Sequence, residues 1–551
     1  MKKHLYLIIL SMLLLQQVVY SQSGNTPDVI TQTIKGTVTD KNTKLRIPGV
    51  TVRLTSTQPA KAAATGADGV FRITGVPVVG RHSVEISCTG FETLIISDVL
   101  VISGKETELN LELNSSSQQL SEVVVRHGVV KRPLNTMAMA SGRSFSPEET
   151  NRYAGAFFDP ARMAQSFAGV VAGGDNNEII VRGNSPKSLQ WRLEGIEIIN
   201  PNHFSNNGSA GGAISMINST MLSTSDFYTG AMPAEYNNAT AGVFDLKFRK
   251  GNTDRREYSF TAGVLGVGAT LEGPFSKGSQ SSYLISYRYS SLDLLMKMGV
   301  DISDGGVPRY QDLSFNFVFP TRKAGTFSLF GIGGSGGLKE KAKHDIQEWD
   351  ERKDAFEYDG KYTAGSFGLK NIYVANEKLY ISHILSYSGD YTTSTSDSLS
   401  QTYIPSLVYR GEFNNTTVRY AGMINYRPDN SNTIRAGLNA GLLNYNMRSL
   451  SYKQELKALD EVLNQKGSAA TFDAYIENKH DFGNSVSLNT GIHTNYFNLS
   501  KSFTIEPRVG LNWQFRSDQQ LSFAAGTYSR IEPLAYYFAK GTDLSGKRAV
   551  N

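Results

Sequence analysis

Two short motifs in the chain consist of residue types that could carry out chemistry. The first is His82-Ser-Val-Glu85, since a His-x-x-Glu pair can supply zinc ligands in metallopeptidases. The run that contains it alternates as a β-strand does, and on a strand the side chains of residues i and i+3 point to opposite faces. The two side chains could not then reach one metal ion. We therefore predict neither a metal site nor catalysis at this pair.

The second motif is the glycine-rich run Gly331-Ile-Gly-Gly-Ser-Gly-Gly337, which fits both a dinucleotide-binding fingerprint and the Gly-x-Ser-x-Gly sequence of hydrolases. Both of those sites require a strand that turns directly into a helix. Here the run closes a strand and leads into a charged segment, so neither site is expected. We interpret these glycines as positions of close backbone approach in the wall of a sheet.

Charge and cysteine content exclude several other functions. The 55 Lys and Arg residues and the 50 Asp and Glu residues leave a formal net charge of +5 over 551 residues, which is too dilute for a nucleic-acid-binding face. The chain has a single cysteine, Cys88, which excludes a disulfide framework, a thiolate zinc site and an iron–sulfur centre. We expect a protein that is not an enzyme, has no cofactor and binds no nucleic acid.

The composition predicts a chain made mainly of β-strands and turns. It contains 52 glycines, 27 tyrosines and 27 phenylalanines, and most of the tyrosines follow residue 255. Residues 1–21 combine a basic start, a short apolar run and small residues near Ser21, which predicts a secretory signal peptide. A spanning helix would need about 20 apolar residues, more than this run has.

Residues 33–113 contain short alternating strands separated by turns, which predicts a β-sandwich of the seven-strand type. The residues that carry a family pattern are Gly36, Asp40, Pro48-Gly49-Val50, Asp68-Gly69-Val70-Phe71, Gly75 and Gly90-Phe91. In these residues the segment resembles the carboxypeptidase regulatory-like (transthyretin-like) domain. The resemblance implies an accessory domain rather than an enzyme.

Residues 114–135 join this sandwich to the next domain. A polar linker, Asn114–Gln119, precedes an apolar run whose members are Leu120, Ser121, Glu122, Val123, Val124 and Val125. The run is either one more buried strand or a tethered strand that pairs with the sheet edge of a partner.

Residues 136–250 mix helix and strand signals and resemble the plug of TonB-dependent outer-membrane receptors. The matching pieces are Ile180-Val181-Arg182-Gly183, the acidic–glycine pair Glu194-Gly195, Pro233-Ala234-Glu235-Tyr236 and the strand that begins at Gly242. Glu194 stands where the family usually has Asp, and Asn237 where it usually has Gly, which leaves the class of ligand open.

From residue 255 to 551 the chain alternates between apolar and polar residues, strand after strand. Short polar turns such as Thr321–Gly325 and Pro428–Asn432 interleave with long segments at 291–308, 338–361 and 449–468. Short turns at one end and long loops at the other are typical of outer-membrane barrels. The fold class is therefore mainly β, with a transthyretin-like sandwich, an α+β plug and a partial antiparallel transmembrane barrel.

The number of strands predicts that the sequence is a fragment. We find about 12 or 13 strands before Asn551, whereas barrels that enclose a plug have about 22. The chain also ends on a hydrophilic segment, where barrels of the family usually end on a strand with a terminal aromatic residue.

The resemblance implies the N-terminal part of a TonB-dependent receptor with a regulatory-like extension, as in Bacteroidetes-like receptors. Such a protein lies in the cell outer membrane, in contact with its lipid, with the N-terminal domain in the periplasm and the long loops outside. It binds a scarce extracellular solute that the sequence does not identify. The TonB energy-transducing complex pulls on a strand, here Leu120, Glu122, Val123, Val124 and Val125.

Two groups of site residues complete the sequence predictions. Arg182 is expected to be a buried charge of the plug, paired with Glu194 or with a carboxylate of the barrel wall. Asn202, His203 and Phe204 are expected in an exposed plug loop, where His203 and Phe204 contact the ligand and Trp349 closes over it. Two other functions stay open: a signalling receptor that acts through its N-terminal domain, and an exported carbohydrate-binding or adhesin array of sandwiches.

Overall fold

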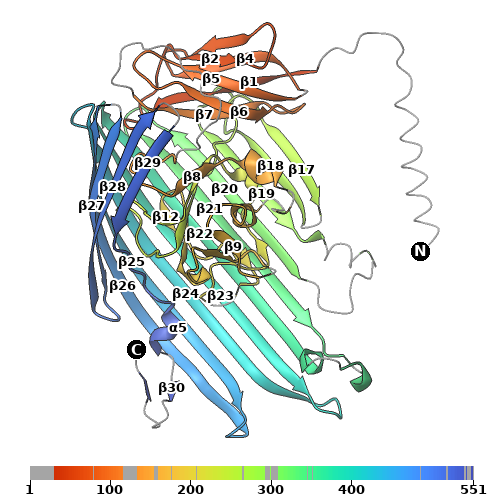
Figure 1. Cartoon of the computed structure of the whole chain (residues 1–551). Helices are drawn as coiled ribbons and strands as arrows, with labels where there is room; N and C mark the ends of the chain where they lie inside the picture. The colour runs from red at the N-terminus through yellow and green to blue at the C-terminus, as the bar shows by residue number, and fades with distance from the viewer. Residues whose placement is uncertain are drawn as a thin grey trace, which may run out of the picture.

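The computed structural model describes residues 30–115 and 133–549, with short gaps at 79, 154, 156–158, 175, 206–207, 264–265, 292–297, 299–307, 344, 350–351, 484, 517–518, 539–540 and 543–547. The predicted signal peptide and the predicted coupling strand lie outside the described residues. Figure 1 shows a small sandwich at one end of a tall wall of strands, with the plug inside the wall.

The N-terminal domain is a sandwich of two sheets, as predicted. One sheet has the order β4-β1-β7 and the other the order β3-β2-β5-β6. The strands are β1 (Thr31–Asp40), β2 (Thr51–Leu54), β3 (Lys61–Ala64), β4 (Val70–Pro77), β5 (Arg81–Ser87), β6 (Leu94–Leu100) and β7 (Thr107–Leu113). The inward side chains alternate along each strand and form a closed apolar core that includes Val52, Phe71 and Ile86.

The His-x-x-Glu pair of this domain serves the fold. His82 is buried, and its ring nitrogens lie 3.0 Å from the Ser56 hydroxyl and 2.8 Å from the Pro77 carbonyl oxygen. Glu85 instead faces outward and pairs with Arg53 on the neighbouring strand at 2.8 Å. The two side chains therefore have separate partners, as their positions on β5 predict.

The plug contains a five-stranded sheet with two short helices and two small hairpins. The sheet order is β12-β11-β16-β15-β8, in which β11 and β16 run parallel. Ser146 caps α2 by accepting the amide of Glu149, and Asp159 caps α3 by accepting the amide of Ala161. The elements are β8 (Gly142–Phe145), α2 (Pro147–Arg152), α3 (Pro160–Ala164), β9 (Val170–Ala172), β10 (Ile179–Val181), β11 (Leu189–Leu193), β12 (Ile196–Glu197), β13 (Asn202–His203), β14 (Ile214–Ser215), β15 (Ser225–Tyr228) and β16 (Gly242–Leu246).

The wall is one antiparallel sheet of 13 strands among the described residues, in sequential order from β17 to β29. Its strands are β17 (Glu257–Gly263), β18 (Gly266–Pro274), β19 (Ser282–Tyr289), β20 (Arg309–Pro320), β21 (Thr326–Glu340), β22 (Phe356–Asn376), β23 (Leu379–Leu399), β24 (Pro405–Tyr426), β25 (Asn432–Lys453), β26 (Ala458–Phe482), β27 (Val486–Phe497), β28 (Ser502–Arg516) and β29 (Gln519–Gly526). The short helix α5 (Leu534–Phe538) and the hairpin β30 (Gly541–Thr542) and β31 (Arg548–Ala549) follow.

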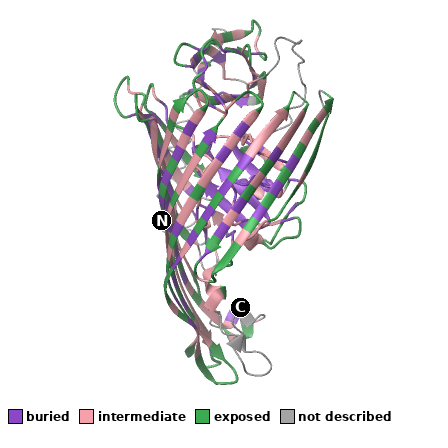
Figure 2. Ribbon diagram, turned by 90° about the vertical axis from the view of Figure 1, so that its left-hand side faces the viewer, coloured by how far each residue is buried: buried purple, intermediate pink, exposed green. Residues whose placement is uncertain are grey.

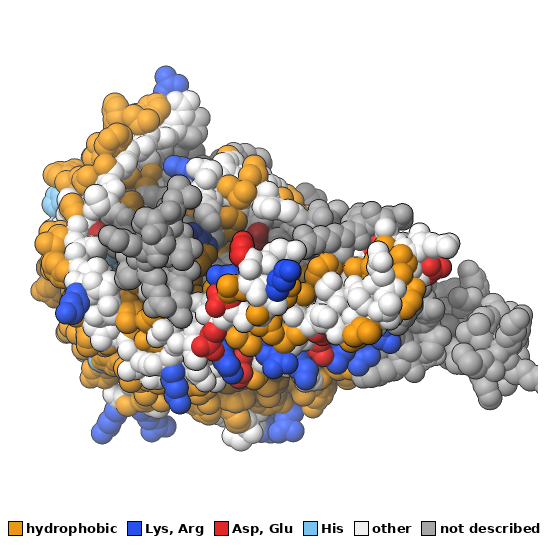
Figure 3. All heavy atoms as spheres, turned by 90° about the horizontal axis from the view of Figure 1, so that it is seen from below, with side chains coloured by type: hydrophobic (Ala, Val, Ile, Leu, Met, Phe, Trp, Pro, Cys, Tyr) orange, Lys and Arg blue, Asp and Glu red, His pale blue; other side chains and the backbone are white. Residues whose placement is uncertain are grey.

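Burial along the wall is the reverse of that in a soluble sheet. Leu313 and Trp513 are 45% and 48% exposed, whereas Asp312 and Arg508 are each only 4% exposed. Figure 2 shows the resulting bands of exposed and buried residues along each strand, and Figure 3 shows apolar side chains gathered on the outer surface. An apolar outer face with a polar inner face packed on a plug is the pattern of a transmembrane barrel, as the alternation predicts.

One predicted long loop is wrong. Residues 449–468 are not a loop, because β25 and β26 continue to pair almost to their turn at 454–457. The ion pairs Arg448–Glu461, at 3.0 Å, and Lys453–Asp460, at 2.8 Å, join the two strands there. The sequence Lys453–Asn464 is rich in Lys, Glu and Leu, which favour helices. Hydrogen bonding between the two strands overrides that preference.

Candidate functional site

Five Lys and Arg residues on the described strands of the wall contact the plug. Lys370 on β22 pairs with Glu194 at 2.9 Å, Arg419 on β24 with Glu197 at 3.1 Å, and Arg435 on β25 with Glu235 at 2.8 Å. Arg288 on β19 donates to the carbonyl oxygen of Ser215, and Arg508 on β28 donates to plug carbonyls. We call Arg288, Lys370, Arg419, Arg435 and Arg508 the wall cations. They surround the plug with charge-assisted hydrogen bonds, which are stronger than neutral ones.

The turn Pro233–Tyr236 is the part of the plug that the wall contacts most densely. Arg508 Nη1 donates to the carbonyl oxygens of Pro233 and Tyr236, the latter at 2.7 Å. Glu477 accepts the amide of Ala234 at 2.8 Å, and a ring nitrogen of His493 lies 2.9 Å from the Ala234 carbonyl oxygen. The turn is thus fixed to three neighbouring strands of the wall, β26, β27 and β28.

Tyr236 connects this turn to the centre of the plug. The side chain is buried, its hydroxyl donates to Asp245 at 3.0 Å, and the guanidinium of Arg192 lies 4.9 Å from its ring centroid. Burial raises the pKa of Tyr236 well above its usual value, and the neighbouring carboxylates raise it further, so the phenol remains a hydrogen-bond donor. The predicted structural residues Pro233 and Tyr236 therefore lie together at the interface of plug and wall.

The predicted partner of Arg182 is wrong. Arg182 is exposed and donates to the hydroxyl of Ser141 at 2.7 Å. Arg182 and Gly183 both have positive φ, which places them in the turn that ends β10 and directs the Arg side chain to the plug surface. Glu194 and Gly195 form the tight turn between β11 and β12, also with positive φ at both residues, as a two-residue hairpin turn requires. That turn brings Glu194 to Lys370 of the wall.

We therefore expect Arg182→Ala and Lys370→Ala to have different effects. An exposed substitution changes the free energy of unfolding by about 0.5 kcal/mol or less, whereas loss of Lys370 leaves the largely buried Glu194 without its cation at a cost of about 3 kcal/mol. Chemical unfolding of both variants in detergent checks this. Equal destabilisation of the two would contradict the assignment.

The predicted exposed loop at Asn202–Phe204 is also wrong. Asn202 and His203 are fully buried in β13, and His203 Nε2 lies 3.2 Å from the carboxylate of Asp312 on the wall. Burial lowers the pKa of His203 against the opposing effect of Asp312, so the imidazole is neutral at pH 7. The rings of His203 and Phe204 instead pack on Tyr310, with centroids 4.9 and 6.4 Å away.

The interactions of Trp349 described by the structure lie within its own loop. Its indole nitrogen donates to the carbonyl oxygen of Lys343 at 2.7 Å, and the residue is half-buried. The described part of the chain shows no ring contact or hydrogen bond that brings Trp349 together with His203 or Phe204. A role of these three side chains in ligand binding remains a prediction.

The glycine-rich run lies within β21, where it makes room for the plug. A Cβ atom at Gly334 would lie 2.5 Å from the His203 ring, and one at Gly336 would lie 3.1 Å from the Phe204 ring. A Cβ at Gly337 would have no neighbour closer than 3.4 Å. The interpretation of the run as a place of close approach is therefore confirmed at Gly334 and Gly336 but not at Gly337.

Gly334→Val should consequently disturb the seating of the plug, whereas Gly337→Val on the same strand should not. Overpacking of this kind costs about 1–3 kcal/mol. We expect a lower midpoint of thermal unfolding and increased trypsin cleavage of the plug in the first variant only. A normal melting curve for Gly334→Val would show that the plug adapts without cost.

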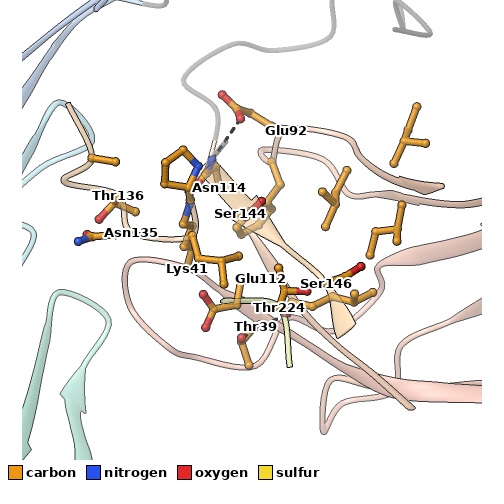
Figure 4. Close-up of a pocket in the computed structure, with 18 of the residues that line it drawn as sticks. Thr39, Lys41, Glu92, Glu112, Asn114, Asn135, Thr136, Ser144, Ser146 and Thr224 are labelled. Atoms are coloured by element: carbon orange, nitrogen blue, oxygen red, sulfur yellow. Dashed lines mark hydrogen bonds between the residues drawn. The ribbon is translucent and has the colours of Figure 1, made fainter. Parts of the chain in front are cut away.

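A large cavity separates the plug from the sandwich. Its volume is about 2830 Å³, and it is lined by edge strands β6 and β7 of the sandwich, by the plug and by the short turns of the wall. Figure 4 shows Lys41 and Glu112 of the sandwich facing Asn135, Ser144 and Thr224 of the plug across this space. We call it the vestibule.

Lys41 in the vestibule donates to the carbonyl oxygen of Pro133 at 3.2 Å. Burial lowers the pKa of Lys41 to about 8, and the nearby carboxylate of Glu112 opposes that effect. The unfolded chain retains this proton up to a pKa of 10.5, so the unfolded state binds more protons between the two values. We expect the free energy of unfolding to rise as the pH increases from about 8 toward 10.5, and Lys41→Met to remove that rise. Denaturant titrations at both ends of this range measure the difference.

Several of the residues that define this site are not among the sequence predictions. The wall cations and their neighbours Glu477 and His493 occupy the polar-facing positions of strands that alternate clearly. A charge at such a position indicates a contact in the lumen, and that signal is present in the sequence for each of them. The sequence does not identify the plug residue that each of these side chains contacts, because that depends on the depth at which each strand passes the plug.

Comparison with solved structures shows that the chain shares its fold with bacterial receptors and transporters. The copper transporter OprC has 12% identity and a TM-score of 0.52, and the match covers 74% of this chain and 67% of that one. A mutant of the ferric enterobactin receptor PfeA from Pseudomonas aeruginosa has 12% identity and a TM-score of 0.51, with 73% and 63% covered. The siderophore receptor PirA from Acinetobacter baumannii has 14% identity and a TM-score of 0.50, with 73% and 62% covered.

The N-terminal sandwich matches a family by sequence. Residues 33–114 match the model of the carboxypeptidase regulatory-like domain. No match was found among the curated proteins. The chain spans slightly more than three fifths of the length of the first solved structures that it resembles.

No helix in the described part of the chain is both long and apolar enough to span a membrane. The described residues also contain no group of three or more His, Cys, Asp or Glu side chains placed to hold a metal ion.

Proposed function

We propose that the protein is an outer-membrane receptor that takes up a scarce extracellular solute with energy from the TonB complex. The observation that carries this proposal is a plug fixed inside a wall that is apolar outside and charged inside. Such a plug blocks free diffusion, so a solute crosses only when the plug is rearranged. Rearranging the plug requires work, which a pull by an energy-transducing partner would supply.

The pull would act on Leu120–Val125. This segment lies between the sandwich and the plug in the sequence, and the last described residue before it and the first after it, Ser115 and Pro133, both line the vestibule. A strand with three consecutive valines can pair with the sheet edge of a partner through backbone hydrogen bonds. In this proposal the sandwich and vestibule face the periplasm. The turn between the long strands β25 and β26 faces the outside of the cell.

The proteins that share this fold include a copper transporter, a ferric enterobactin receptor and a siderophore receptor, which suggests copper and ferric siderophores as probes. Uptake of radiolabelled copper(II) and of ferric enterobactin by cells that express the protein, with and without a proton uncoupler, tests the proposal. Energy-dependent accumulation of a probe supports it, whereas surface binding of a probe without any accumulation indicates a receptor that does not transport.

The alternative function as an exported carbohydrate-binding or adhesin array of sandwiches is inconsistent with the fold. The described strands after residue 255 form one 13-stranded sheet around a plug and not an array of sandwiches. A signalling role of the N-terminal domain remains compatible with the fold, and pull-down with residues 22–113 tests it.

A further inference from the structure

The sandwich contacts the wall on two separate sides of its rim. On one side, Lys35 Nζ lies 2.7 Å from the Asp254 carboxylate and 2.6 Å from the amide oxygen of Asn252. Arg72 also pairs with Asp254, at 2.8 Å, and Lys105 pairs with Glu272 on β18. These contacts fix the sandwich to the segment that precedes β17 and to β18.

The second side lies at the turn that follows β24. The side-chain amide of Asn425 donates to the backbone carbonyl of Asn42 at 3.1 Å, and Arg427 donates to the hydroxyl of Ser115. Arg81 adds a contact to the plug through its ion pair with Glu148 on α2. The sandwich therefore spans the end of the barrel, as Figure 1 shows.

We propose that the sandwich is a gate over the exit of the barrel, and that it must leave its docked position before a solute can enter the periplasm. The inference rests on the proposed transport function, and it assigns to the N-terminal domain a role that its family match does not specify.

The size of the vestibule supports a gate. Binding sites for small molecules usually measure about 300–1,000 Å³, so a solute that passes the plug fits within the vestibule. The sandwich closes one side of the vestibule, since β6 and β7 line it. A solute that reached the vestibule would therefore meet the docked domain.

The chemistry of the docking contacts supports a reversible gate. The side chains of Arg72 and Asp254 are 46% and 49% exposed, and exposed ion pairs are individually weak. Glu272 is only 3% exposed, but it keeps Arg249 as a partner when Lys105 leaves. The apolar core of the sandwich is complete without the wall, so the domain loses no core packing when it undocks. Lys35 and Arg72 also keep a partner within the sandwich, Glu106, at 3.1 and 2.5 Å.

The first test measures docking without any cargo. Thr224→Cys in a Cys88→Ser background places one thiol in the vestibule, and a bulky polyethylene-glycol maleimide in nanodisc samples reports access to it. Asp254→Lys repels Lys35 and Arg72 but leaves their pairs with Glu106 in place. We expect labelling to become about tenfold faster with Asp254→Lys, because about 1.4 kcal/mol of lost attraction is a tenfold change in an equilibrium. Glu377→Lys, in an exposed short turn without a contact to the sandwich, is the matched control and should leave the rate unchanged.

The second test measures gating. Asn42→Cys and Asn425→Cys, joined by a reductant-cleavable bismaleimide, tether the sandwich across the rim. Arg53→Cys and Glu85→Cys, joined in the same way within the sandwich, form the control. We expect the first tether to stop accumulation of copper(II) or ferric enterobactin reversibly while surface binding persists.

The outcomes separate this inference from the proposed function. Equal labelling rates for all variants, or normal uptake with the sandwich tethered, would refute the gate. If the untethered protein accumulates neither probe, the transport proposal loses its support, and the labelling rates alone decide whether the sandwich closes the vestibule.

Discussion

Val124→Pro is expected to abolish energy-dependent uptake while surface binding of the same probe remains normal. Proline has no amide hydrogen and fixes φ, so it removes a hydrogen bond and disturbs pairing between strands. An unsatisfied backbone partner costs about 1–3 kcal/mol, which weakens a partner that binds through a strand by roughly tenfold to a hundredfold. Accumulation of copper(II) or ferric enterobactin measures the effect, and binding to de-energised cells provides the comparison.

Ser117→Pro provides the matched control for this substitution. It lies in the polar linker before the apolar run, where no strand pairing is proposed, so uptake should remain normal. If Val124→Pro transports as well as the unmodified protein, the coupling strand lies elsewhere in the chain.

Arg508→Ala is expected to have the largest effect on the seating of the plug. The guanidinium is buried, donates to the Pro233 and Tyr236 carbonyls, pairs with Glu506 at 2.6 Å and stacks on Tyr528. Its removal leaves Glu506 buried without its cation and frees the turn from β28, at a cost of about 3–5 kcal/mol. We expect the plug to loosen and sensitivity to a large antibiotic such as vancomycin to increase.

Arg516→Ala tests whether this effect is specific to the plug contact. Arg516 lies on the same strand but is exposed, so its loss should leave both stability and antibiotic sensitivity unchanged. An Arg508→Ala variant that is folded, impermeable and fully active would show that Glu477 and His493 fix the turn without it.

The fold could be predicted from the sequence because each of its periodicities is local. Alternation along β27 and β28 identifies strands and their two faces without knowledge of what the faces contact. Gly331–Gly337 likewise indicates a close approach before the approaching residue, His203, is known. The turns that join neighbouring strands are also visible as local runs of polar residues.

The site could be predicted only in part, because its contacts connect residues far apart in the chain. The sequence places Arg182 and Glu194 in adjacent motifs, yet the positive φ of Arg182 directs its side chain to the surface. Glu194 instead meets Lys370, 176 residues away. Asn202 and His203 form a polar, turn-like sequence, but Asn177 of the plug partners Asn202 and Asp312 of the wall partners His203, which permits their burial. No local pattern reports such a partner.

The two ends of the segment that joins the sandwich to the plug lie at the vestibule, and this arrangement limits how far the sandwich can travel. The 17 residues numbered 116–132 can span at most about 60 Å even when fully extended. A domain joined by so few residues has an effective concentration near its docking surface of roughly millimolar. It should therefore return within its own molecule after each release, and an isolated copy of the domain added at micromolar concentration should compete poorly for the rim.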